Sequence, residues 1–128
     1  MKLPILFFIL LFSLISCGQN MIERKLMGVW VISKIEYSDS TNDKYKLWDN
    51  IIGITNKNEL TLPKTTPGQS GSGNWFINKA GEDYYILFDV DNGYFQGNYK
   101  IDLSEYERYK QVRLQSNELT MVCKKVWQ

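Results

Sequence analysis

The segment from Tyr84 to Ile101 constrains the fold more than any other part of the chain. Two runs of alternating residues flank Asn92-Gly93, a dipeptide that favours the two-residue turn of a β-hairpin. The residues on one face of this hairpin are all bulky and apolar or aromatic, except Gly97. They are Tyr84, Ile86, Phe88, Val90, Phe95, Gly97, Tyr99 and Ile101. A helix cannot produce this partition, and a register shift by one residue would reverse it. The segment therefore predicts an antiparallel hairpin with Ile86 opposite Tyr99 and Phe88 opposite Gly97.

Further short strands are expected along the rest of the chain. β-branched and aromatic residues indicate strands at 26–37, 48–54, 59–62 and 74–79. Ser116-Asn117 is a plausible turn of a second hairpin, which sets Leu114 opposite Leu119 and Val112 opposite Met121. Residues 38–46, 64–72 and 102–107 are expected to be loops, and a helical turn is expected from Asn20 to Gly28. The sequence predicts an all-β fold, an antiparallel up-and-down barrel of about eight strands with a short N-terminal helical turn. An open sandwich is the alternative.

The N-terminus has the features of an export signal. Lys2 precedes an apolar run over residues 3–15 that is shorter than the roughly 20 residues a membrane-spanning helix requires. The following Leu14-Ile15-Ser16-Cys17 resembles a bacterial lipobox. This resemblance implies that residues 1–16 are a signal peptide and that Cys17 carries the lipid. An ordinary secreted protein with a free thiol is the alternative.

The expected mature chain begins at Cys17 and is bound to a membrane by its lipid. Residues 17–25 are then a lipidated tether with a short helical turn, and residues 26–128 form the barrel domain. The tether sequence Gly18-Gln19-Asn20 contains no acidic residue, which favours a periplasm-facing leaflet of the envelope over the cell surface. Loss of Lys2 leaves 14 basic and 14 acidic residues, a balance that argues against nucleic acid as a partner.

The residue types present argue against catalysis. The chain contains no histidine, which excludes Ser-His-Asp and Cys-His catalysis and most zinc sites. Asp89-Val90-Asp91-Asn92-Gly93 lacks the distal glutamate of a calcium loop, and the turn already accounts for Asn92-Gly93. We expect no catalytic residue, no metal and no cofactor. Cys123, which has no disulfide partner if Cys17 is lipidated, is expected to face the core.

Gly28 and Trp30, just after the expected helical turn, resemble the Gly-x-Trp start of lipocalin-like families. With the lipobox, the similarity is greatest to the short lipocalin-like lipoproteins of Bacteroidetes-type bacteria. The resemblance implies a barrel whose tryptophan closes one end beneath a basic residue of the last strand. Here that residue would be Lys124 or Lys125, where the family has arginine, held by a cation–π contact.

Two functions follow from such a barrel. In the first, the domain holds a small apolar or amphipathic ligand, which enters beside residues 63–73. The candidate lining residues are Trp75, Tyr84, Ile86, Phe88, Phe95, Tyr99 and Met121. In the second, the same side chains simply fill the barrel, and the protein binds another envelope protein as an inhibitor or immunity-type lipoprotein. An internal cavity of about 300 Å³ or more favours the first function, and an exposed apolar patch favours the second.

Overall fold

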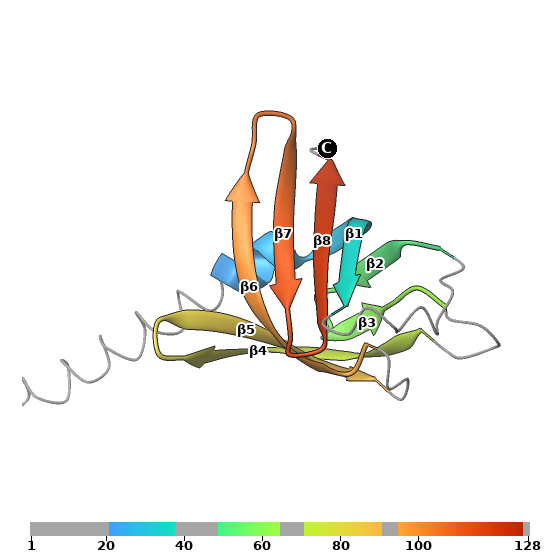
Figure 1. Cartoon of the computed structure of the whole chain (residues 1–128), viewed down its shortest axis with the longest axis vertical. Helices are drawn as coiled ribbons and strands as arrows, with labels where there is room; N and C mark the ends of the chain where they lie inside the picture. Colours follow the sequence, from blue (N-terminus) through green and yellow to red (C-terminus); the bar gives the residue numbers. More distant parts are fainter. Residues whose placement is uncertain (1–20, 38–48, 65–70, 91–94, 127–128) are drawn as a thin grey trace, which may run out of the picture.

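The computed structural model describes residues 21–37, 49–64, 71–90 and 95–126 (Figure 1). A helical turn covers residues 21–26. The strands that follow are β1 (Gly28–Tyr37), β2 (Ile51–Ile54), β3 (Glu59–Thr61), β4 (Ser72–Ala80), β5 (Asp83–Val90), β6 (Gly97–Glu105), β7 (Tyr109–Gln115) and β8 (Leu119–Val126).

The strands form a closed barrel in which each one pairs antiparallel with its neighbours in sequence. Pairing of β1 with β8, with Ile35 opposite Met121, closes the sheet on itself. The register of this pair shifts between Ile32 and Lys34, where Ser33 Oγ donates a hydrogen bond to the Val122 carbonyl at 3.0 Å. The predicted all-β, eight-stranded up-and-down barrel with a short helical turn is confirmed.

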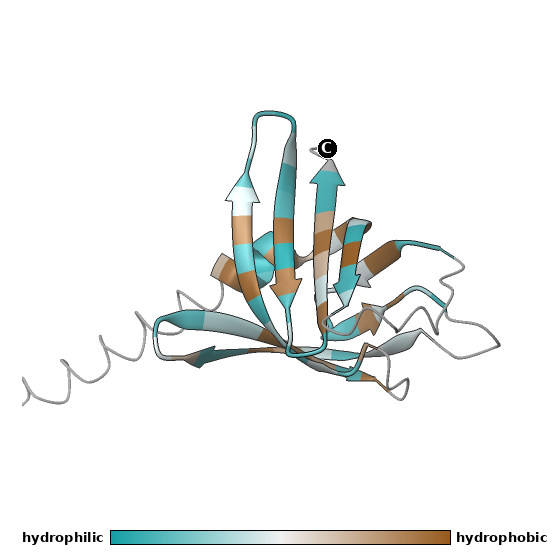
Figure 2. Cartoon of the chain, in the orientation of Figure 1, coloured by the Kyte–Doolittle hydropathy of each residue, from teal (hydrophilic) through white to brown (hydrophobic). Residues whose placement is uncertain are grey.

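The alternating sequence pattern places the core inside the barrel. Hydrophobic and hydrophilic residues alternate along the second half of β7 (Figure 2), because successive side chains of a strand point to opposite faces. The inward side chains meet in one buried cluster, which also takes in Leu26 from the helical turn. Burial of this apolar surface is the main favourable contribution to folding.

The β5–β6 hairpin has the predicted register. Ile86 lies opposite Tyr99 and Phe88 lies opposite Gly97. The rings of Phe88 and Tyr99 are packed with their centroids 4.9 Å apart. The turn dipeptide Asn92-Gly93, from which the register was deduced, lies outside the described residues.

The β7–β8 hairpin differs from the prediction by two residues. Leu114 lies opposite Met121 and Val112 opposite Cys123, so the central turn residues are 117 and 118. Ser116 accounts for this difference. Its Oγ accepts a hydrogen bond from the Leu119 amide at 3.1 Å, which moves the centre of the turn one residue toward the C-terminus. A shift of two keeps every side chain on its predicted face.

Several predicted element boundaries were wrong. The expected loop at 102–107 is shorter, because β6 continues to Glu105 and the Tyr106 amide donates to the Tyr109 carbonyl at 2.9 Å across a tight turn. The polar residue Asp102 lies on the outer, exposed face of β6 and not in a loop. β1 begins at Gly28 rather than at residue 26, since the helical turn continues through that residue.

Candidate functional site

One end of the barrel is closed by Trp30 and Lys125, as the resemblance implied. Trp30 is buried, and its indole Nε1 donates to the Leu26 carbonyl at 2.7 Å. Lys125 Nζ lies 4.8 Å from the centroid of the Trp30 ring. The predicted cation–π contact is therefore present, and Lys125 rather than Lys124 makes it. Lys124 lies instead over Tyr109, at 5.1 Å.

Lys125 also connects the last strand to the helical turn. Its Nζ donates to the Lys25 carbonyl at 3.2 Å and to the Met27 carbonyl at 2.8 Å. Desolvation lowers the pKa of Lys125, and the positive charge of Lys110 lowers it further. The two carbonyl oxygens and the indole ring offset this cost, so the ammonium group holds both ends of the described chain together.

Gly28 permits this arrangement. Its φ of +130° disfavours any side chain, and a Cβ there would lie 3.2 Å from the Lys125 Cδ. The glycine of the Gly-x-Trp pair thus lets the chain turn from helix to strand directly beneath the lysine.

Lys125→Met is expected to lower the free energy of unfolding by about 1.5–3 kcal/mol. The substitution keeps an apolar side chain but removes two charge-assisted hydrogen bonds and the cation–π contact. Lys124→Met is the matched control, because Lys124 is exposed. This substitution should lower the free energy of unfolding by less than about 0.5 kcal/mol. Urea denaturation measures both. Equal costs for the two variants would show that Lys125 does not clamp the barrel end.

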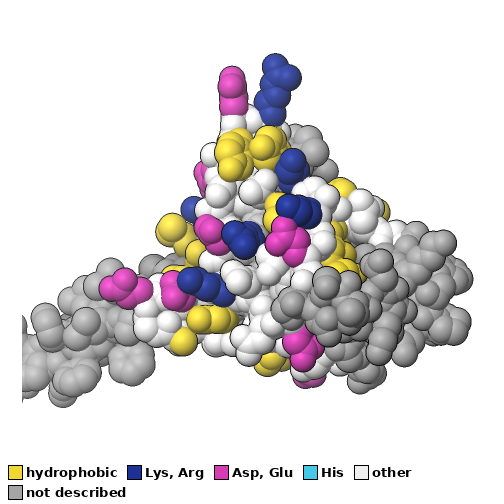
Figure 3. Space-filling view, in the orientation of Figure 1, with side chains coloured by type: hydrophobic (Ala, Val, Ile, Leu, Met, Phe, Trp, Pro, Cys, Tyr) yellow, Lys and Arg dark blue, Asp and Glu magenta, His cyan; other side chains and the backbone are white. Residues whose placement is uncertain are grey.

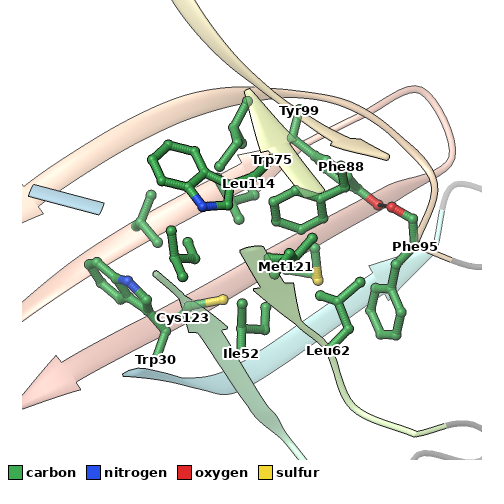
Figure 4. Close-up of a cluster of buried hydrophobic side chains, with 14 of the residues drawn as sticks. Trp30, Ile52, Leu62, Trp75, Phe88, Phe95, Tyr99, Leu114, Met121 and Cys123 are labelled. Carbon is green, nitrogen blue, oxygen red and sulfur yellow. Dashed lines mark hydrogen bonds between the residues drawn. The ribbon is translucent and has the colours of Figure 1, made fainter. Parts of the chain in front are cut away.

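The predicted lining residues Ile86, Phe88, Phe95, Tyr99 and Met121 lie inside the barrel and expose at most 1% of their surface. They pack against one another within the core cluster (Figure 4). The Tyr99 hydroxyl donates to the Phe95 carbonyl at 2.9 Å, so the one polar atom of this group is satisfied. Burial raises the pKa of Tyr99, with a smaller contribution from Glu118. These five predicted lining residues are therefore tightly packed members of the core.

The other two predicted lining residues lie in different surroundings. Trp75 is 2% exposed and its Nε1 donates to the Thr55 carbonyl at 3.0 Å, so it belongs to the core and not to a rim. Tyr84 is only half-buried, near the end of the β4–β5 hairpin, and Lys79 Nζ lies 5.3 Å from its ring centroid.

Cys123 is a buried thiol of the core, as predicted. Burial raises its pKa to about 12 from the usual 9.0. Since the thiolate is the reactive form, this shift lowers the reactive fraction about a thousandfold near neutral pH.

We therefore expect Cys123 to react with iodoacetamide at pH 8 at least about a hundredfold more slowly in the folded protein than in urea. Peptide mass spectrometry distinguishes Cys123 from Cys17. Equal rates in the folded and unfolded chains would contradict the burial of this thiol.

The outer surface carries an apolar strip that sequence analysis did not single out. Val29, Val31 and Ile51 are 60%, 42% and 46% exposed, and Val31 lies opposite Ile51 in the β1–β2 register. We call these three residues the β1–β2 strip. Lys124 borders it on β8 and Thr61 borders it on β3. The sequence does indicate this strip, because residues 29–32 are apolar at four consecutive positions. Successive side chains of a strand point to opposite faces, so some of these apolar side chains must lie on the outer face.

The described residues contain no group of three or more acidic, cysteine or histidine side chains that could hold a metal ion. In the same part of the chain no helix has the length and apolar character needed to cross a membrane. Comparisons with protein-family models, with curated proteins and with solved structures found no match. The lipocalin-like resemblance therefore stays a prediction.

Proposed function

We propose that this protein is a lipid-anchored, non-catalytic protein of a bacterial envelope that binds another envelope protein through its outer surface. The barrel serves as a filled scaffold in this proposal. The observation that carries it is the burial of the predicted lining, where Ile86, Phe88 and Met121 expose none of their surface. A ligand of drug-like size needs a cavity of roughly 300 Å³, and side chains without exposed surface leave no room for one directly beside them.

The β1–β2 strip supports a protein partner. Adjacent exposed apolar side chains with a polar border are typical of interaction surfaces. Val29, Val31 and Ile51 meet this description, because Lys124 and Thr61 flank them on the neighbouring strands.

The proposed anchor determines how the barrel is presented. Three residues lie between Cys17 and Met21, and the four Cα–Cα steps of an extended chain reach at most about 14 Å. The helical turn is therefore held near the bilayer surface, in the periplasm-facing leaflet that we infer from the tether.

In vivo photocrosslinking tests the proposed partner surface. A benzophenone amino acid is introduced at Ile51 in the full-length protein in its host, and at Phe76 as the control. Both side chains are 46% exposed, so probe accessibility is matched. We expect a discrete protein adduct from position 51 that is reduced by the second substitution Val31→Lys. The absence of a protein adduct from position 51, or the same adduct from position 76, would contradict the proposal.

The hypothesis of a small ligand inside the barrel stays a prediction. It requires a hollow interior, whereas the proposed scaffold has a filled one. It requires the core side chains to move apart and a molecule to copurify with the folded protein. The packing of Phe88 against Tyr99 favours the filled scaffold over this alternative.

A further inference from the structure

The outer face of the barrel is hollowed near the middle of β6, where its pairing with β5 ends and its pairing with β7 begins. β6 pairs with β5 up to Lys100 and with β7 from Lys100 onward. The β4–β5 and β6–β7 hairpins point in different directions beyond this residue (Figure 1). A groove of about 640 Å³ lies between the outer side chains of β5 and β6 and the β7–β8 turn. A smaller hollow of about 320 Å³ also borders Lys100 and Gln115.

Charges are matched at Lys100, which borders the groove, and in the smaller hollow beside it. Lys100 Nζ lies 3.6 Å from Asp83 Oδ2, and Asp102 faces Arg113 in the β6–β7 register. Glu118, at the turn, has an interaction of its own. Over β6 to β8, basic and acidic side chains lie next to each other (Figure 3). The described part of the groove therefore favours an uncharged ligand over a phosphate or a metal ion.

Amide side chains supply many of the hydrogen-bonding groups along the groove. Asn98, Gln115 and Asn117 all border it, and each amide both donates and accepts hydrogen bonds. Asn78 Nδ2 donates to Asn98 Oδ1 at 3.0 Å, which fixes that amide and leaves its own NH₂ group as a donor. A set of paired donors and acceptors matches hydroxyl groups, which have the same dual capacity.

Tyr85 adds an aromatic surface to these amides. It lies on the outer face, half-buried, opposite Lys100. An aromatic ring offers a flat apolar face with a polar tip, and a sugar ring offers the complement: an apolar C–H face bordered by hydroxyl groups. The volume of the groove is also within the range of small-molecule sites.

We propose that this groove binds a short, uncharged oligosaccharide, with Tyr85 stacked on a sugar ring and the amides of Asn98 and Gln115 bonded to its hydroxyl groups. The site lies on β5 to β7 and is separate from the β1–β2 strip. It does not depend on the function proposed above.

Titration of the full-length protein in detergent with tetra-N-acetylchitotetraose and with cellotetraose tests the site. Both probes are uncharged β-linked tetrasaccharides, and calorimetry should give a dissociation constant of about 1 mM or below for at least one of them. Tyr85→Ala should weaken binding about tenfold. Tyr106→Ala is the control, because Tyr106 is an exposed tyrosine that does not border the groove. Gln115→Ala alters only an exposed side chain and should also weaken binding, so it serves if Tyr85→Ala fails to fold.

Three outcomes would overturn the proposal. The first is that neither saccharide binds. The second is that binding is unchanged in both groove variants, and the third is that tetra-alanine occupies the groove while the saccharides do not.

Discussion

Trp30→Ala is expected to lower the free energy of unfolding by about 3–5 kcal/mol, the usual cost of removing a large aromatic side chain from a core. Trp30 is 1% exposed, lies beneath Lys125 and donates to the Leu26 carbonyl. Its loss leaves a cavity, an unpaired carbonyl oxygen and an ammonium group without its ring. Because a domain of this size is stable by only about 5–15 kcal/mol, the variant should be close to unfolding at 37 °C. Thermal and urea denaturation measure the change.

Phe76→Ala is the matched control for Trp30→Ala. It also removes an aromatic side chain from a strand, but Phe76 is 46% exposed on the outer face. We expect its cost to stay near 0.5 kcal/mol. If both variants lose the same stability, Trp30 does not close the barrel.

Cys17→Ala is expected to move the protein from the membrane fraction to the soluble fraction, or to leave it as an unprocessed precursor. Two or three acyl chains hold a protein at a bilayer almost permanently, since each buried CH₂ contributes about 0.8 kcal/mol. Without the thiol there is no attachment point. Fractionation with a carbonate wash, followed by immunoblotting, measures the distribution.

Cys123→Ala is the control for the anchor, because it removes the other cysteine of the chain from the barrel core. It should stay with the membrane as the native protein does. Recovery of Cys17→Ala with carbonate-washed membranes at native mature length would show that Cys17 is not the anchor.

The β-hairpins show how far the sequence determines the register. The alternation of residues 84–101 and the dipeptide Asn92-Gly93 together predicted the pairing of Ile86 with Tyr99, and the structure has this pairing. For β7–β8, alternation selected the correct face, but it repeats every two residues and cannot exclude a shift of two. The register was then decided by the Ser116 hydroxyl, which bonds the Leu119 amide. This local side-chain contact within the turn is not visible in a pattern of apolar and polar residues.

The site was harder to predict than the fold. The contact between Trp30 and Lys125 joins residues 95 positions apart, and only a family resemblance indicated it. The inward direction of Ile86 and Phe88 followed from alternation, but whether they line a cavity or fill it depends on packing in three dimensions. The groove at Lys100 was missed because it results from β6 changing partners, which no single strand's sequence reveals.

Native mass spectrometry of the full-length protein from its host tests the filled barrel most directly. The protein is purified in detergent, and the detergent is removed from the ionised protein inside the mass spectrometer. The mass of the folded protein is then compared with the mass of the denatured chain. A barrel filled by its own side chains predicts equal masses once detergent and loosely bound lipid are removed. One small apolar molecule per chain, retained by the folded protein and lost on denaturation, would contradict it.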